Sequence, residues 1–404
     1  MNINTQARVP LGRVLALGGL SSFGPLALDL NLPALPQLAE DLRAPVAYAQ
    51  LSLSVCMIGL ALGQLLVGPL ADRVGRRRPL LIGVASFAVT AGLCAVAPSI
   101  EALLVLRLLG GLAGGAGLVI ARAMVRDLYG GAAAARVFAL LMLVSGTAPI
   151  VGPVLGGQLL RVTDWRGVFA ALALIGAVLF VAALTQRETL PAADRRAGGL
   201  RATAAALGDV LVDRTFLMPA LVQGLGMCAM FTYIAMGSFV LQDGRALDGA
   251  LNPQTYAVVF AVNGLGIVLA GRVSAVVVGR VGPRRLLGVG VVLALVAALA
   301  LLAGALASRS VWALLVPLLL LVSCTGLFMP NATALALAGQ GGRAGTASAL
   351  LGLLQFTFAA AVPPLASLRG VTATVMAVTI LATALAAALV FLAVLRTPVP
   401  APVG

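Results

Sequence analysis

The chain consists largely of uncharged apolar runs, separated by short charged segments. Leu51 to Gly68 and Leu80 to Ala97, for example, contain no charged residue. An α-helix needs about 20 apolar residues to cross the hydrocarbon core of a bilayer. Transmembrane strands would instead give alternating segments of about 10 residues, and these are absent. With 61% hydrophobic and 10% charged residues, the chain is an all-α membrane protein by composition, since soluble domains are far less apolar.

Twelve such runs predict twelve transmembrane helices. They are expected near 11–32, 48–70, 79–97, 101–125, 136–160, 166–186, 216–241, 255–279, 285–307, 311–338, 343–366 and 371–395. An even number of helices places both termini on one side of the membrane. Twenty arginines lie on that side and six on the other. Because basic residues accumulate in cytoplasmic loops, we predict cytoplasmic termini in a bacterial inner membrane.

The longest polar stretch, Arg187 to Arg214, divides the chain near its middle. We expect residues 1–186 and 215–404 to form two pseudo-symmetric six-helix bundles, joined by a cytoplasmic linker at 187–214. A basic loop at 271–285 repeats, in degenerate form, the loop at 68–80. Weak internal symmetry of this kind is typical of transporters, whose substrate sites lie near the membrane midplane between repeats.

Composition also excludes several classes of protein. The net charge of +14 comes from arginines in short loops, so orientation in the membrane explains it better than a nucleic-acid partner. The four cysteines show no pairing or metal-binding pattern, and no phosphate-binding loop is present. With no histidine in the chain, any proton carrier must be a carboxylate. No nucleophile, base and metal set converges, so we do not expect an enzyme.

The loop at 68–80 carries one acid, four arginines, two glycines and two prolines. Its spacing, G-x-L-A-D-R-x-G-R-R, resembles the loop between helices 2 and 3 of major facilitator transporters. With the acid and arginine at the end of the fourth run, it predicts a conformational switch at the inner mouth. Its members are Gly68, Asp72, Arg73, Gly75, Arg76, Arg77, Arg126 and Asp127. The alternative is that these arginines only anchor a cytoplasmic loop.

Two charged residues lie inside apolar runs. Asp29 lies inside the first run, before Pro33 and Pro36, and Arg107 lies beside a glycine-rich stretch in the fourth. A charge within a membrane helix is costly, so a functional role is the default interpretation. We predict that Asp29 carries the proton and that Arg107, which does not deprotonate, is a fixed positive charge. The alternatives are a solvated helix end for Asp29 and a snorkelling side chain for Arg107.

The fifth run contains Ser145 to Gly157, with Gly152, Pro153 and Gly156 in a G-P-x-x-G-G pattern. Two prolines among glycines predict a bent helix that packs closely against a neighbour. We count these three residues with the conformational switch.

Taken together, the chain resembles the Bcr/CflA branch of the drug:proton antiporters in the major facilitator superfamily. The resemblance extends over essentially the full length and includes D-x-x-L-P-A-L-P-Q at 29–37, Arg126-Asp127-Leu128-Tyr129 and Glu188-Thr189-Leu190-Pro191. Similar transporters carry an arginine at the place of Arg107, and the fifth-run pattern marks drug antiporters. The chain departs from relatives at Asn31 and Cys56, where tyrosine is common, and at Gly237-Ser238-Phe239, where Ser-Pro-Phe is more usual.

The resemblance implies proton-coupled efflux of small drug-like molecules, neutral or monocationic, of phenicol or bicyclomycin type. The proton gradient would be the only energy source, with no cofactor or metal, in a monomeric protein embedded in lipid. Candidate substrate-binding residues are Asn31, Gln50, Tyr233, Asn263 and Gln355, each of which has interhelical hydrogen bonding as its alternative role. Alternative functions are a metabolite exporter for sugars or peptides, a proton symporter, or a receptor without transport.

Overall fold

The computed structural model describes residues 11–129, 137, 141, 151–191, 195, 208–244, 246–338, 340, 344–368 and 370–396. Within this part of the chain the regular structure is helical, and eleven helices are long and apolar enough to cross a membrane. The all-α membrane fold predicted from the sequence is thus confirmed. Most of the predicted helix 136–160 lies outside the described residues; 151–159 is helical.

The chain divides into two compact units. Unit 1 comprises Met1–Asn31, Val55–Leu155 and Leu159–Gly199, and unit 2 comprises Leu32–Ser54, Gly156–Gln158 and Leu200–Gly404. The long helices up to residue 199 are α1 (Leu11–Asp29), α3 (Val46–Val74), α4 (Arg77–Ala95), α5 (Ile100–Leu128) and α7 (Trp165–Leu184). Those after it are α9 (Arg214–Leu241), α10 (Pro253–Val281), α11 (Pro283–Ala307), α12 (Trp312–Leu337), α13 (Ala344–Ser367) and α14 (Ala373–Arg396).

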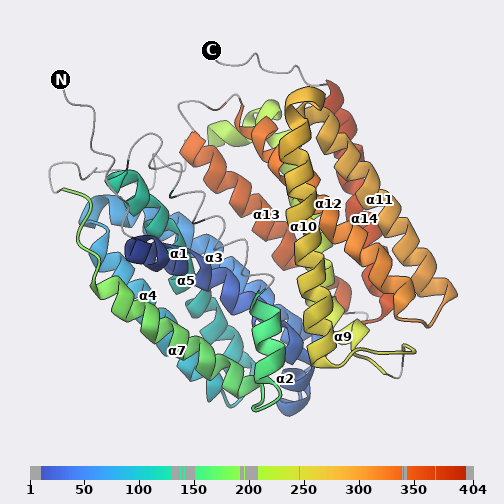
Figure 1. The fold of residues 1–404 in the computed structure, drawn as a ribbon, viewed down its shortest axis with the longest axis horizontal. Helices are drawn as coiled ribbons and strands as arrows, with labels where there is room; N and C mark the ends of the chain where they lie inside the picture. Colours follow the sequence, from blue (N-terminus) through green and yellow to red (C-terminus); the bar gives the residue numbers. More distant parts are fainter. Residues whose placement is uncertain are drawn as a thin grey trace. The chain divides into compact units, whose positions relative to one another are not determined.

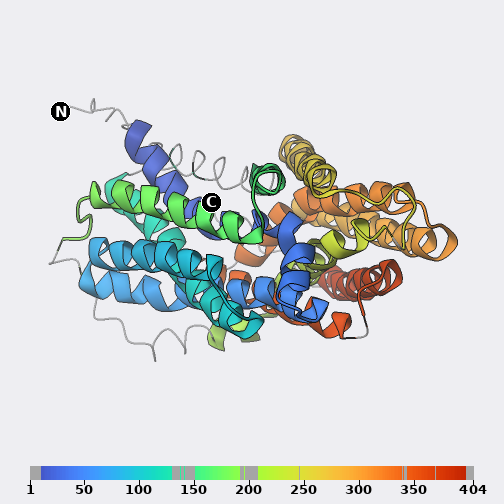
Figure 2. The same cartoon turned by 90° about the horizontal axis from the view of Figure 1, so that it is seen from below.

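The same pattern of neighbouring helices occurs in both units (Figure 1). In unit 1, α4 contacts α5 and α7, and α1 contacts α5 and α7. In unit 2, α11 contacts α12 and α14, and α9 contacts α12 and α14. Figure 2 shows α4 beside α7 and α11 beside α12 from a second direction. Each described pair in unit 1 thus has a counterpart six spans later in the chain, which is the internal symmetry expected from the two basic loops.

Glycines hold α3 and α5 at backbone contact in unit 1. A Cβ at Gly111 would collide with the Cys56 carbonyl, and one at Gly59 with the Leu108 carbonyl. The seam continues one turn further along both helices, where Gly63 and Gly115 face each other. Small residues allow this approach in lipid, where packing and not the hydrophobic effect holds helices together.

Unit 2 repeats this seam between α10 and α12. A Cβ at Gly326 would collide with the Ile267 carbonyl and lie 2.7 Å from the Gly271 nitrogen. In both units, glycines therefore lie where one helix crosses its partner at backbone distance.

The first span is broken, which corrects the prediction of one helix over 11–32. α1 ends at Asp29; a 3₁₀ turn, η1 (Leu32–Ala34), and a short helix, α2 (Leu35–Asp41), follow. Pro33 lacks an N–H and disfavours a helical conformation for the residue before it. Pro36 lies at the start of α2, where a missing N–H costs nothing.

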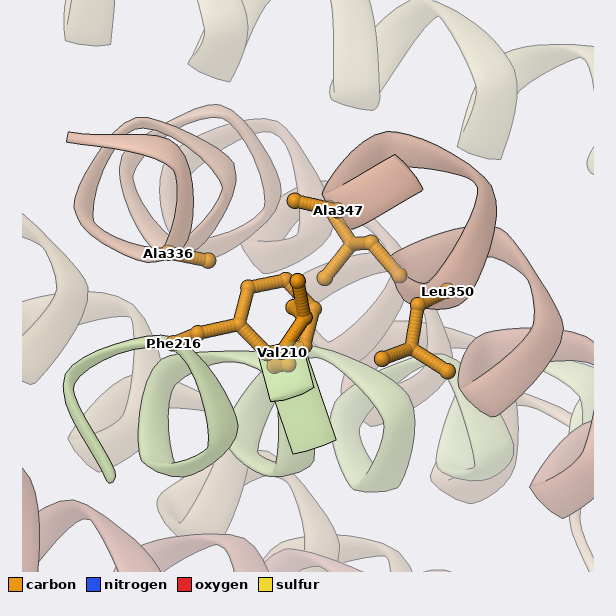
Figure 3. Close-up of a cluster of buried hydrophobic side chains, with 7 residues drawn as sticks. Val210, Phe216, Ala336, Ala347 and Leu350 are labelled. Carbon is orange, nitrogen blue, oxygen red and sulfur yellow. The ribbon is translucent and has the colours of Figure 1, made fainter. Parts of the chain in front are cut away.

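A buried hydrophobic cluster joins α9, α12 and α13 in unit 2 (Figure 3). Its members are Val210, Phe216, Ala220, Ala336, Ala347, Leu350 and Leu351. Val210 belongs to a helical turn at 208–212 that precedes α9, so the end of the predicted linker packs against the bundle. We call these seven residues the α9–α12–α13 cluster.

Asp213 fixes the same region with polar contacts. Its carboxylate caps α9 by accepting from the Thr215 backbone N–H (2.9 Å) and also accepts from Gln340 Nε2 (2.7 Å). Burial acts to raise the pKa of Asp213, but the hydrogen bonds from Thr215, Gln340 and Phe216 outweigh it, so its pKa lies below the usual value. The start of α9 is thereby tied to the segment that joins α12 to α13.

We predict that Gly111→Ala destabilises the protein, because the new methyl group would push α3 away from α5. Overpacking of this kind costs about 1–3 kcal/mol. Gly352→Ala, on α13, is the matched control: it has open space around it and gains about 1 kcal/mol of helix propensity. Thermal unfolding in detergent should therefore show a lower Tm for the first variant only. Equal Tm values for both would contradict the seam.

Candidate functional site

Three charged side chains are buried among the described residues, namely Asp29, Arg76 and Arg107. All three belong to unit 1. The buried polar side chains described in unit 2 are neutral. A buried charge costs free energy unless it is paired. The three buried charges of unit 1 are therefore the first candidates for functional groups.

Asp29 is the last residue of α1 and is 8% exposed. This burial argues against the solvated helix end considered from the sequence. Gly152 lies against it: a Cβ at Gly152 would be 2.8 Å from the Asp29 Cβ and 3.3 Å from the Leu30 nitrogen. The glycine of the fifth-run pattern thus leaves room for the acid, and Pro153, also buried, follows it.

Arg107 lies on α5 and is 4% exposed, so it is not a snorkelling side chain. Its Nη1 donates to the Ala27 carbonyl at 2.9 Å, two residues before Asp29. Its guanidinium is also 5.6 Å from the centre of the Phe169 ring on α7. Asp29 and Arg107 do not form an ion pair within 4.0 Å of each other in the described part of unit 1. Arg107 therefore binds the backbone at the end of α1 and not the Asp29 carboxylate.

Asn31 lies two residues after Asp29 and is 1% exposed. Neither atom of its amide has a hydrogen-bond partner among the described residues. An unsatisfied buried amide is costly, and such groups are often completed by a ligand or water.

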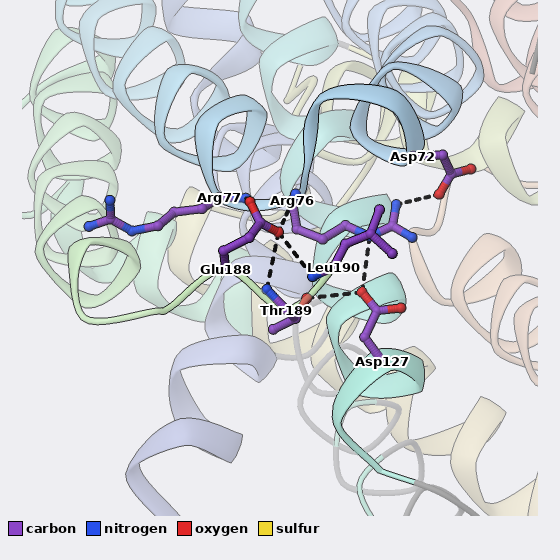
Figure 4. Close-up of polar contacts among 7 residues, drawn as sticks. All are labelled: Asp72, Arg76, Arg77, Asp127, Glu188, Thr189 and Leu190. Carbon is purple, nitrogen blue, oxygen red and sulfur yellow. Dashed lines mark hydrogen bonds and ion pairs between the residues drawn. The ribbon is translucent and has the colours of Figure 1, made fainter. Parts of the chain in front are cut away.

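The turn between α3 and α4 is only two residues long and is held by one carboxylate (Figure 4). Glu188 accepts from the backbone N–H of Arg76 (2.7 Å) and of Arg77 (3.1 Å), at the start of α4. Gly75, at φ +98°, makes the turn, and a side chain there would meet the same carboxylate. The segment after α7 therefore clamps the α3–α4 turn.

The electrostatics of Glu188 fit this contact. Partial burial acts to raise its pKa, but hydrogen bonds from the backbone N–H groups of Arg76, Leu190, Arg77 and Thr189 lower it below its ordinary value of 4.5. These are charge-assisted hydrogen bonds at a helix N-terminus, where a negative charge is favoured.

The buried guanidinium of Arg76 joins both acids predicted for the switch. Its Nε lies 3.0 Å from Asp127 Oδ2 and its Nη1 2.5 Å from Asp72 Oδ1. Asp127 also accepts from the Thr189 hydroxyl at 2.9 Å. The contact of Asp127 with the loop arginines that the sequence suggested is thus present, and Thr189 connects it to the Glu188 clamp (Figure 4).

The remaining switch residues are placed as follows. Arg77 donates to the carbonyls of Gln186 (2.9 Å) and Leu184 (3.2 Å) at the end of α7. Arg73 is exposed. Gly68 is half-buried, and a Cβ at this position would lie 3.5 Å from the Val119 side chain. The Arg126 side chain lies outside the described residues. Gly156 is buried and belongs to unit 2.

The candidate substrate-binding residues of unit 2 form separate hydrogen bonds. Asn263 Nδ2 donates to the Tyr233 hydroxyl at 2.8 Å, and both side chains are buried. The Tyr233 ring stacks on Phe260 with centroids 5.6 Å apart. Gln50 accepts from the Ser367 hydroxyl, whereas Gln355 accepts from Gln223. In this structure Tyr233 and Asn263 thus bind each other.

Sequence reasoning did not include Glu188 and Thr189 in the switch. Glu188 was noted only as part of a pattern shared with relatives. The available signal was an acid directly after a long apolar run, in a segment otherwise rich in arginine.

Comparison with known proteins identifies the family. The model of the Major Facilitator Superfamily matches residues 16–364, so the chain belongs to this superfamily of transporters. This confirms the family expected from the motifs, and with the apolar helices it makes the protein a multi-pass membrane protein.

Three relatives show how the chain compares with curated proteins. It is 35% identical over 391 residues to an uncharacterized MFS-type transporter, YdgK, of Bacillus subtilis, covering 96% of each chain. It is 27% identical to a bicyclomycin resistance protein homolog of Haemophilus influenzae, covering 86% of each. It is 29% identical to the multidrug resistance protein MdtL of Klebsiella pneumoniae, covering 93% of each.

Solved structures agree on the fold. The nucleoside transporter NupG is similar with a TM-score of 0.77 at 14% identity, over 95% of this chain and 98% of that one. A bacterial homolog of the human lysosomal transporter Spinster is similar with a TM-score of 0.74 at 16% identity, over 95% and 96%. At these identities the likeness supports the major facilitator fold alone.

We predict that Glu188→Gln loosens the α3–α4 turn. The neutral amide loses the charge-assisted bonds to Arg76 and Arg77, so hydrogen exchange at these two amides should become roughly tenfold faster. Because folding lowers the Glu188 pKa, its contribution is complete above the ordinary value of 4.5 and is lost as the pH falls from there through the lowered pKa of the folded protein. Protection corrected for intrinsic exchange should fall accordingly on acidification.

Asp72→Asn is the control for this experiment. It removes one of the two ion pairs of the Arg76 guanidinium, but the Asp72 side chain is 47% exposed, and exposed pairs contribute only about 0–1 kcal/mol. Exchange at the turn should therefore remain near that of the wild type. If both variants exchange alike, the Glu188 carboxylate does not clamp the turn.

Proposed function

We propose that this protein exports small drug-like molecules, neutral or monocationic, in exchange for protons. The observation that supports this most is the buried carboxylate of Asp29 at the broken end of the first span, with Gly152 against it and Arg107 bound to the backbone two residues earlier. The names of relatives, which include multidrug and bicyclomycin resistance proteins, support a drug as cargo.

In this mechanism Asp29 takes up a proton on the outer side and releases it on the inner side. Cargo and proton compete for the carrier, so that each drives the other across. Arg107 provides a constant positive charge near the end of α1 while the charge on Asp29 changes. The proton gradient is the energy source and no cofactor takes part.

The network around Arg76 acts as a switch on the inner side. Arg76, Asp127, Thr189 and Glu188 hold α3, α4, α5 and the segment after α7 in one arrangement. Opening requires these contacts to change together, and a partly buried network biases such an equilibrium more than isolated exposed pairs do. The protein would work as a monomer in a bacterial inner membrane, with both termini in the cytoplasm.

We predict that Asp29→Asn abolishes proton-driven uptake of chloramphenicol into everted membrane vesicles. The amide has nearly the shape of the carboxylate but cannot bind and release a proton. Binding of chloramphenicol to the purified variant should persist, because the cargo is neutral. Glu40→Gln, which neutralises an exposed carboxylate on α2, is the control and should transport like the wild type. Unchanged proton-driven uptake by Asp29→Asn would refute the assignment of the carrier.

A further inference from the structure

Three polar side chains of unit 2 form a chain of hydrogen bonds across three helices. The Thr333 hydroxyl on α12 donates to Gln223 Oε1 on α9 at 2.9 Å. Gln223 Nε2 then donates to Gln355 Oε1 on α13 at 3.3 Å. We call Thr333, Gln223 and Gln355 the amide relay. Thr333 and Gln223 had no place in the site expected from the sequence.

The order of donors and acceptors in the relay determines which hydrogen-bonding groups of Gln355 remain unused. Gln223 is 2% exposed, with its carbonyl bound to Thr333 and its amide nitrogen to Gln355. The carbonyl of Gln355 is therefore already used as an acceptor. Its amide nitrogen, which has two N–H donors, donates to no residue in the described part of the chain. Gln355 is half-buried, so the relay ends in hydrogen-bond donors that a ligand can reach.

The residues next to Gln355 along α13, Leu354 and Phe356, are apolar. Phe356 follows Gln355 on α13, and its ring centre lies 6.4 Å from that of Phe231 on α9. One turn before Gln355, Leu351 belongs to the buried α9–α12–α13 cluster. A hydrogen bond in an apolar setting is stronger than the same bond in water. The free donors of Gln355 therefore favour an oxygen acceptor carried by an otherwise apolar molecule.

We propose that the amide relay is a cargo-recognition element, in which Gln355 donates to a carbonyl or nitro oxygen of a neutral molecule. Gln223 and Thr333 are positioning residues that orient the Gln355 amide. This inference rests on the proposed export of small molecules and specifies its substrate class: acceptor-bearing neutral compounds are recognised through the relay, and cations without acceptors are not.

The test is equilibrium binding to purified protein with two labelled probes. Chloramphenicol carries amide and nitro oxygens, whereas tetraphenylphosphonium has no hydrogen-bond acceptor. Gln355→Met keeps the side-chain length and removes the donors, so we expect chloramphenicol affinity to fall about tenfold and that of tetraphenylphosphonium to stay unchanged. Thr333→Val should act in the same direction but less strongly, and Thr333→Ser should restore binding.

Gln64→Leu is the matched control, because Gln64 is a membrane glutamine on α3 whose amide donates to the Leu60 carbonyl of its own helix at 3.2 Å. It should leave both affinities unchanged. Absence of chloramphenicol binding by the wild type, an equal loss for both probes, or no loss in Gln355→Met would each overturn the relay. If binding depends on Gln355 but vesicles show no proton-driven uptake, the relay stands and the exporter assignment fails.

Discussion

The close approach of helix backbones at glycine is the constraint on which the rest of the structure depends. In unit 1 it places α5 directly against α3, which brings Arg107 to the end of α1 and Asp127 to the α3–α4 turn. In unit 2 the same contact between α10 and α12 accompanies the same pattern of neighbours. The two units therefore share the same glycine-mediated helix packing but differ in the polar side chains that they carry.

The divergence follows charge. Unit 1 buries two ionic groups within its spans, Asp29 and Arg107, and a third at its α3–α4 turn, Arg76. In the described spans of unit 2 the buried polar groups are neutral amides and hydroxyls, and two of them, Asn263 and Tyr233, bind each other. In the mechanism that we propose, the acid of unit 1 couples transport to protons, and the neutral polar groups of unit 2 recognise the cargo.

Many of these features could be predicted from the sequence, because a membrane span requires a long apolar run and a charged residue within such a run is easily recognised. The helical class, the two basic loops, Asp29, Arg107 and the meeting of Asp127 with the loop arginines all follow from where charge interrupts apolar runs. The break of α1 was missed because its apolar run continues past Asp29 to Leu32, and only the local effect of Pro33 ends the helix. The Glu188 clamp and the amide relay were missed because hydrogen bonds between residues more than 100 positions apart leave no local pattern.

The position of Gln355 on α13 connects the proposed recognition element to the nearby hydrophobic core. Gln355 and Leu351 are four residues apart on one helix and so lie on the same face. A tilt of α13 that separates Leu351 from Phe216 and Val210 in the cluster also moves the Gln355 amide relative to Gln223. By thermodynamic reciprocity, a molecule that binds more tightly to one arrangement of the relay must stabilise the matching arrangement of the cluster by the same coupling free energy.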